Sequence, residues 1–249
     1  MPESTASLGA VIVAAGSGTR MGRPSTLRPG SGQAGSGQAL DKLFIPLGGR
    51  PVLAHALAAF QECAAVQHIV LVLPAGNLER GRRFVQEHGF DKVHRVCGGG
   101  PRRQDSVRLG LEALGPCQWV AIHDGARPLI TPDLIVRGLE AARDAGAAVP
   151  ALPLADTVKE AGPDATVLRT LDRSRLWAVQ TPQIFRYDLL LRAHQEVTAD
   201  ATDDAAMLEA LGLPVRIFPG SRLNLKITTP EDLTLAEAIL AAAAAPAAL

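Results

Sequence analysis

The chain has 249 residues, with 25 basic and 25 acidic side chains and a formal net charge of zero. This balance argues against a general nucleic-acid-binding protein, which would carry a basic excess. No apolar run reaches the roughly 20 residues that a membrane-spanning helix needs. The three cysteines, Cys63, Cys97 and Cys117, lack a metal-ligand spacing and are interpreted as reduced core thiols. We therefore predict a cytoplasmic protein without nucleic-acid or membrane partners.

Short apolar runs predict a series of buried β-strands. The runs are continuous rather than alternating, which indicates strands that are covered on both faces, as in a mostly parallel sheet. The predicted strands are residues 10–14, 68–73, 92–96, 119–122, 147–152 and 215–218.

Amphipathic stretches between these runs predict helices over residues 51–60, 103–114, 132–144 and 230–245. Thr131 and Thr229 precede two of them as N-caps. Strand–helix alternation of this kind predicts an α/β fold with a doubly wound, mostly parallel, Rossmann-like sheet. Such sheets bind ligands at the carboxyl ends of their strands.

Two segments interrupt the alternation. Residues 23–40 are rich in Gly, Ser, Pro and Gln and cannot bury a core, so we expect a flexible insertion. Residues 153–180 contain β-prone pieces on either side of Gly162-Pro163-Asp164. This second pattern predicts a hairpin that leaves the main sheet as a protruding β-arm.

The first predicted strand runs into a glycine-rich turn over residues 14–22. Glycines and small residues let backbone N–H groups approach an anion closely. The turn matches neither a P-loop nor the GxGxxG dinucleotide fingerprint. Arg20 inside the turn, and Lys42 after the insertion, favour an anion site. A purely structural turn and a solvated lysine remain the alternatives.

Charged residues follow directly after the predicted strand 119–122, in the run His123-Asp124-Gly125-Ala126-Arg127-Pro128. Charges at the end of an apolar strand are costly unless they are paired or used. Asp124 and Arg127 are therefore candidate ligand-binding residues, with a simple ion pair between them as the alternative. His123 is expected to be packed rather than to act as a general base.

The opening Ala-Ala-Gly-x-Gly-x-Arg-Met, followed by a lysine, resembles the nucleotidyltransferases that make sugar and polyol nucleotides. More specifically, the chain is similar to the 2-C-methyl-D-erythritol 4-phosphate cytidylyltransferase family of the non-mevalonate isoprenoid pathway. Two features depart from the family pattern: the 23–40 insertion, and Pro101, where many members have an acidic or small residue. Further motifs match in the family's order at residues 99–107, 123–128, 156–159, 180–183, 201–204 and 224–228.

The resemblance implies transfer of the cytidylyl group of CTP to 2-C-methyl-D-erythritol 4-phosphate, with Mg²⁺ or another divalent cation. It also implies one nucleotidyltransferase domain over residues 1–249 and a homodimer formed through the 153–180 arm. A ribitol 5-phosphate cytidylyltransferase shares these motifs and is the nearest alternative. A noncatalytic nucleotide-binding subunit is an alternative of another class, and retention of the charged motif residues argues against it.

By the same resemblance, three sets of residues form the site. Charge on the reacting phosphates is stabilised by Arg20, Lys42 and Lys226. The nucleotide is bound by Ala14, Ala15, Gly16, Gly18, Gly99, Gly100, Ser106 and Asp124. Asp124 also lies near the metal. The polyol phosphate is held by Arg127, Thr157, Arg173, Thr181 and Thr202, with Arg173 acting on the neighbouring subunit's site.

Local structural roles remain open for several of these residues. Ser106 and Asp105 could cap the helix that begins near residue 103. Asp203 and Asp204 have the pattern of a helix-start acid pair, and Lys226 could be a solvated charge. The hairpin could also fold back on its own domain rather than meet a second copy.

Overall fold

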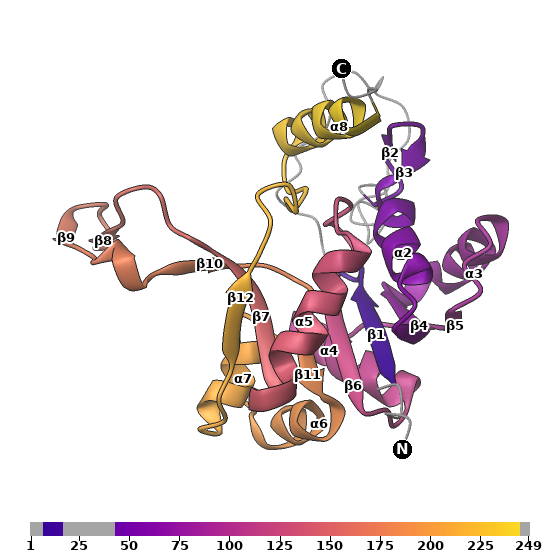
Figure 1. Ribbon diagram of the computed structural model, residues 1–249, viewed down its shortest axis with the longest axis horizontal. Coiled ribbons are helices and arrows are strands. Elements are labelled where there is room, and N and C mark those ends of the chain that lie inside the picture. The colour runs from indigo at the N-terminus through magenta and orange to yellow at the C-terminus, as the bar shows by residue number, and fades with distance from the viewer. Residues whose placement is uncertain (1–6, 17–42, 245–249) are drawn as a thin grey trace.

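The computed structural model describes residues 7–16 and 43–244, which form an eight-stranded mixed sheet with helices on both faces (Figure 1). The predicted insertion 23–40, together with Gly18, Arg20 and Lys42, lies outside the described residues. No helix in the described ranges is long and apolar enough to cross a membrane. All three cysteines are free thiols, but of the predicted core positions only Cys63 is buried, whereas Cys97 and Cys117 are half-buried.

The sheet consists of β1 (Leu8–Val13), β4 (Val66–Leu73), β5 (Val93–Gly98), β6 (Trp119–Asp124), β7 (Ala147–Pro153), β10 (Trp177–Val179), β11 (Gln183–Arg186) and β12 (Arg216–Pro219). The α-helices are α2 (Val52–Glu62), α3 (Leu78–Glu87), α4 (Arg103–Leu114), α5 (Pro132–Ala145), α6 (Tyr187–Glu196), α7 (Asp204–Ala210) and α8 (Pro230–Ala244). A short hairpin of β2 (Pro46–Leu47) and β3 (Arg50–Pro51) precedes α2.

The strands follow the order β10-β7-β11-β6-β1-β4-β5, and β12 also pairs with β7. β1 is parallel to β4 and β6, β4 to β5, and β12 to β7, whereas β11 is antiparallel to β6 and β7. Ala148 pairs with both Ile184 and Arg216, so β11 and β12 flank β7 on opposite sides. The carboxyl ends of β1, β5, β6, β7 and β12 therefore share one edge of the sheet, where such sheets bind ligands.

Alternation along β1 supplies two separate hydrophobic cores. Ala10 and Ile12 face the core that α2, α3 and α5 close, and Val11 faces the core that α4, α6 and α7 close. A Cβ on Gly110 of α4 would lie 2.4 Å from the Val11 Cγ1 atom. Glycine there lets α4 lie close to β1, which fixes the start of α4 beside the strand ends.

The structure confirms the doubly wound, mostly parallel sheet that the sequence predicts. Every predicted strand is present with ends shifted by a few residues, and α4 has the predicted bounds. Thr131 caps α5, because its hydroxyl accepts a hydrogen bond from the Leu134 N–H at 3.4 Å. Sequence reasoning missed α3, α6, the body of α7 and the antiparallel β11.

The predicted arm is also present. β8 (Lys159–Ala161) and β9 (Val167–Thr170) pair as an antiparallel hairpin. Figure 1 shows this hairpin standing away from the sheet, beyond β10, rather than folded back on it. All residues of β8 and β9 are exposed, and the exposed fractions of Val167 and Leu168 reach 56% and 65%. The arm therefore presents apolar side chains that nothing in the described part of its own chain covers.

Candidate functional site

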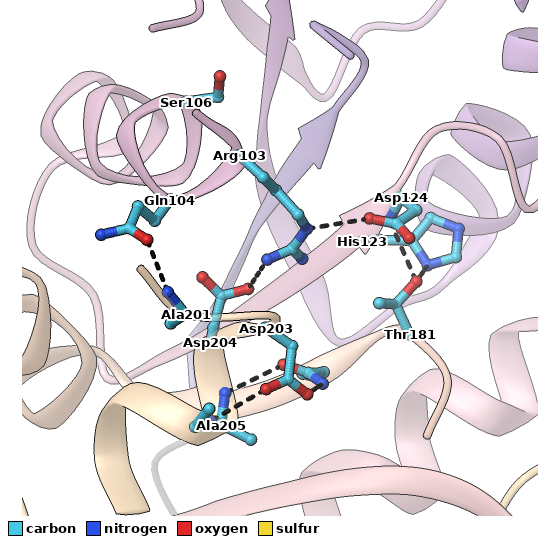
Figure 2. A network of polar contacts seen from close by, with 12 residues as sticks. Arg103, Gln104, Ser106, His123, Asp124, Thr181, Ala201, Asp203, Asp204 and Ala205 are labelled. Atoms are coloured by element: carbon cyan, nitrogen blue, oxygen red, sulfur yellow. Dashed lines mark hydrogen bonds and ion pairs between the residues drawn. The ribbon is translucent and has the colours of Figure 1, made fainter. Parts of the chain in front are cut away.

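A buried carboxylate, Asp124, forms the centre of the candidate site. It ends β6 and is only 8% exposed. The Lys226 Nζ donates to Asp124 Oδ2 at 2.7 Å, and the Arg103 Nε approaches Asp124 Oδ1 at 3.4 Å (Figure 2 shows the Arg103 contact). Burial alone would raise the pKa of Asp124, but Arg103 and Lys226 hold that pKa well below its ordinary value. The carboxylate is therefore ionised at neutral pH.

This arrangement settles two alternatives. Lys226 is not a solvated charge, because it pairs with Asp124. Asp124 and Arg127 do not form a hydrogen-bonded pair; the Arg127 Nη1 donates instead to the Asn224 carbonyl at 2.7 Å. Burial lowers the pKa of Arg127, and its Nε has no hydrogen-bond partner among the described residues. Arg127 thus retains an unused donor near the strand ends.

The segment 221–227 carries Lys226 to the strand ends and is held there by buried amides. The Asn224 Nδ2 donates to the Thr181 carbonyl at 2.8 Å, and the Ile227 N–H donates to the Ala126 carbonyl at 2.8 Å. Gln180 binds the same segment, since its Nε2 donates to the Ser221 carbonyl at 2.8 Å. Fully buried polar groups of this kind have few alternative partners, so they fix the register of the segment.

A tightly packed glycine loop lies between β5 and α4. A Cβ on Gly99 would lie 2.4 Å from the Ala15 Cβ and 2.7 Å from the Ser106 Oγ. No side chain fits there, so backbone groups line this part of the site. The Ser106 hydroxyl accepts from the Gly100 N–H at 3.2 Å, and donates to the Arg102 carbonyl at 3.1 Å. The structure therefore brings Ala15, Gly99, Gly100 and Ser106 together, and their contact with a nucleotide stays a prediction.

Hydrogen bonds connect Asp124 to Thr181, and Thr181 to His123. The Asp124 N–H donates to the Thr181 Oγ1 at 3.1 Å, and that hydroxyl lies 3.1 Å from the His123 Nδ1 (Figure 2). The His123 Nε2 lies 3.2 Å from the Arg127 carbonyl. A carbonyl can only accept, so Nε2 carries the proton and Nδ1 accepts from Thr181. Both ring nitrogens are thus occupied, in agreement with the expectation that His123 is packed and not a general base.

The burial of His123 predicts a pH-dependent stability. Burial lowers its pKa from 6.5 to about 4. Between these values the unfolded chain binds the proton more readily, so the free energy of unfolding should fall by about 3 kcal/mol as the pH drops through this range. Chemical denaturation of His123→Gln between pH 4.5 and 7 should show a flatter dependence than the wild type. The same change at the exposed His68 is the control, and an unaltered slope in His123→Gln would contradict the assignment.

Sequence and structure comparisons agree on one family. A sequence profile described as 2-C-methyl-D-erythritol 4-phosphate cytidylyltransferase matches residues 8–242. The chain belongs to this family. A relative from Dehalococcoides mccartyi (strain CBDB1) with that name is 52% identical over 233 residues, covering 94% of this chain and 96% of the relative. Another, from Pelotomaculum thermopropionicum, is 46% identical and 94% of each chain is covered.

Solved structures of the family have the same fold. A 4-diphosphocytidyl-2C-methyl-D-erythritol synthase from Anaerococcus prevotii gives a TM-score of 0.78 at 28% identity, over 96% of this chain and 100% of that one. A 2-C-methyl-D-erythritol 4-phosphate cytidylyltransferase from Thermus thermophilus gives 0.71 at 34% identity, over 93% and 98%. The chain is thus a nucleotidyltransferase with the α/β architecture that the resemblance implied.

The residues predicted to hold the polyol phosphate differ in their burial and in their position in the fold. Arg127 is partly buried at the strand ends, and Thr181 is buried with its hydroxyl already bonded twice inside the protein. Thr202 is exposed just before α7, and Thr157 is exposed just before β8. Arg173 is exposed on the arm, in the short 3₁₀ helix η2 (Arg173–Arg175). A direct phosphate contact by each of these residues stays a prediction.

The structure adds two residues that sequence reasoning did not place in the site. Arg103 opens α4 and pairs with Asp124 on one side and with Asp204 on the other, the latter at 2.7 Å (Figure 2). Asp204 is fully buried, so it is more than a helix-start acid. Asp203 does have the expected capping role, because its side chain accepts from the Ala206 N–H at 3.0 Å.

The site can hold a divalent cation together with a nucleotide, but not by the side chains of the described residues alone. Within residues 7–16 and 43–244, no group of three or more His, Cys, Asp or Glu side chains could hold a metal. Mg²⁺ commonly binds one or two carboxylates together with substrate phosphates and waters. The ionised Asp124 supplies one such carboxylate, so the residues fit a cation that arrives with a nucleotide rather than one held by the protein alone.

Proposed function

We propose that this chain transfers the cytidylyl group of CTP to 2-C-methyl-D-erythritol 4-phosphate and releases pyrophosphate, in isoprenoid precursor biosynthesis. The family match over residues 8–242 supports both substrates. The observation that carries the proposal is the Lys226–Asp124 pair at the carboxyl ends of the strands, beside a loop that only glycine can form. A cation and a close-packed glycine backbone are groups that can bind a nucleoside triphosphate at the carboxyl ends of the strands of an α/β sheet.

The reaction requires no side-chain nucleophile. An oxygen of the 4-phosphate attacks the α-phosphorus of CTP, a new P–O bond forms, and the bond from the α-phosphorus to the bridging oxygen of pyrophosphate breaks. The attacking oxygen is already ionised at neutral pH, so no proton has to move. Catalysis then depends on alignment and on neutralisation of charge. The occupied nitrogens of His123 and the paired carboxylate of Asp124 are consistent with a site that lacks a general base.

The cations have defined tasks in this proposal. Lys226 stabilises the negative charge that grows on the reacting phosphates, with Arg20 and Lys42 at the two ends of the 23–40 segment. Mg²⁺, held by Asp124 and the triphosphate, would supply further charge neutralisation. Lys226, which is partly buried, acts more strongly there than it would in water.

Selectivity for cytosine is assigned to the loop between β5 and α4. Backbone groups of Gly99 and Gly100 read the edge of the base, and Ser106 contacts the nucleotide. A side chain at position 99 would clash with Ala15 and Ser106, so the Gly99 backbone packs directly against these two residues. A pocket of fixed width accepts a pyrimidine and rejects a purine sterically.

The second substrate and the assembly are proposed together. Arg127, Thr157, Thr181 and Thr202 hold the polyol phosphate, and Arg173 reaches it from a second copy of the chain. The exposed apolar residues of the arm support a homodimer, because an isolated hairpin is barely stable in water. A single domain over residues 1–249 and a cytoplasmic location complete the proposal.

Release of pyrophosphate tests the function. With CTP and Mg²⁺, the purified chain should release pyrophosphate when 2-C-methyl-D-erythritol 4-phosphate is added, and ribitol 5-phosphate should give a kcat/KM at least ~10-fold lower. CTP without an acceptor is the control for hydrolysis. Preference for ribitol 5-phosphate would establish the alternative substrate. Binding of CTP without turnover on either acceptor would leave a noncatalytic nucleotide-binding subunit.

A further inference from the structure

The Asp124 carboxylate is shared by two cations that are held very differently. Lys226 reaches Oδ2 through a flexible stem, and its side chain is 37% exposed. Arg103 approaches Oδ1 and is anchored from the other side, where its Nη1 donates to Asp204 Oδ2 at 2.7 Å. Figure 2 shows the guanidinium lying between the two carboxylates.

Arg103 cannot leave this position without a large cost. The Asp204 side chain is completely buried, and its other oxygen faces the His194 Nε2 at 3.3 Å. Removal of Arg103 would leave the Asp204 charge without its main partner inside the protein, which is strongly unfavourable. The neighbouring Gln104 also links the start of α4 to the segment before α7, since its Oε1 accepts from the Ala201 N–H at 2.9 Å. Of the two cations on Asp124, Arg103 is therefore fixed and Lys226 is exchangeable.

This inference rests on the proposed function, in which Lys226 also binds a substrate phosphate. The different mobility of Arg103 and Lys226 matters for that second role. To bind a substrate phosphate, the ammonium group must give up part or all of its contact with Asp124. The cost of that exchange depends on whether another cation stays beside the carboxylate. We propose that Arg103 is a positioning residue: anchored by Asp204, it remains beside Asp124 as a permanent counter-ion and allows Lys226 to turn to the phosphate.

The test uses variants that avoid a buried unpaired charge. Arg103→Gln/Asp204→Asn replaces the ion pair with two neutral amides, and Asp204→Asn alone is its reference. Asp204→Asn still leaves a cation at position 103, and relative to this reference the double variant should lose at least ~10-fold in kcat/KM. Thermal unfolding confirms that both variants are folded. Asp200→Asn is the control, because it removes the exposed Arg102–Asp200 pair and leaves the Arg102–Asp105 contact at the start of α4 in place.

A Lys226→Ala background separates positioning from a structural role. If Arg103 acts through Lys226, then adding Arg103→Gln to Asp204→Asn/Lys226→Ala should lower kcat/KM by at most about 3-fold. The Lys226 ammonium group that Arg103 would release is already absent from this background. Arg103→Lys, which keeps a cation beside Asp124, should restore part of the loss.

Two outcomes would overturn the proposal. A full additional loss in the Lys226→Ala background would show that Arg103 acts by another route. Wild-type kcat/KM in a folded Arg103→Gln/Asp204→Asn variant would show that it does not act at all. Both leave the proposed function intact if Lys226→Ala by itself is impaired. Wild-type turnover by Lys226→Ala would instead contradict the phosphate role of Lys226 and this inference together.

Discussion

Replacement of Lys226 by alanine is expected to lower kcat/KM by at least ~10²-fold, which corresponds to about 2.7 kcal/mol of transition-state stabilisation. The reason is that the reaction concentrates negative charge on the α-phosphate and the leaving pyrophosphate, and the structure places Lys226 at the strand ends, beside Asp124. Lys42→Ala is expected to have an effect of the same size from its place in the family motif. Steady-state release of pyrophosphate measures both.

Folding should not account for the loss. Asp124 keeps Arg103 as a partner when Lys226 is removed, so no isolated charge is buried. Lys92→Ala is the matched control, because the Lys92 Nζ donates to the Cys63 carbonyl at 2.7 Å and Lys92 lies at the amino end of β5, opposite the site. Near-normal turnover by a folded variant at position 42 or 226 would remove that lysine from the mechanism.

The framework of the fold could be predicted because its signals are local. A buried parallel strand such as β1 is a continuous apolar run, and α5 carries its own start signal in Thr131-Pro132. The elements that were missed lack such signals. α3 fully buries only Gly81 and Phe84, its other residues are mostly charged or polar, and β11 has just four residues. Their structure depends on packing against the rest of the sheet rather than on their own pattern.

The candidate site was predictable where the motif residues themselves touch, and less so where distant parts of the chain pair. Gly99 and Ser106 are close in sequence and meet as expected. Arg103 and Asp204 are 101 residues apart, and nothing in either local pattern indicates the other. The acid pair at residues 203–204 indicated a helix start, which is correct for Asp203, but the burial of Asp204 follows only from the packing of α7 against α4 and α6.

The second large expected effect concerns Arg173 and the arm. Trp177 and Val179 of β10 are 42% and 41% exposed, and Leu168 of β9 is 65% exposed. Several large apolar side chains exposed along one arm favour a surface that a partner covers. The Arg173 Nη1 donates to the Ala155 carbonyl in the same arm, which orients the side chain. We therefore predict a homodimer in which Arg173 serves the polyol phosphate of the neighbouring subunit.

Mixed dimers test this directly. Arg173→Ala and Lys226→Ala should each be strongly impaired alone. If Arg173 acts across the interface, a dimer of one Arg173→Ala chain and one Lys226→Ala chain has one intact site and one site with both defects. Random exchange between equal amounts of the two variants should then restore about a quarter of wild-type activity, because half of the dimers are mixed and each has one working site.

Arg175→Ala is the matched control, since Arg175 is exposed in the same 3₁₀ helix as Arg173 and should tolerate the change with kcat/KM within about 3-fold. Subunit exchange is verified with chains that carry different affinity tags. No recovery of activity despite verified exchange would show that Arg173 serves its own subunit's site or none. A monomer in sedimentation at the assay concentration would reject the arm as a dimer interface, because the exposed apolar residues of β9 and β10 would then remain in contact with water during turnover.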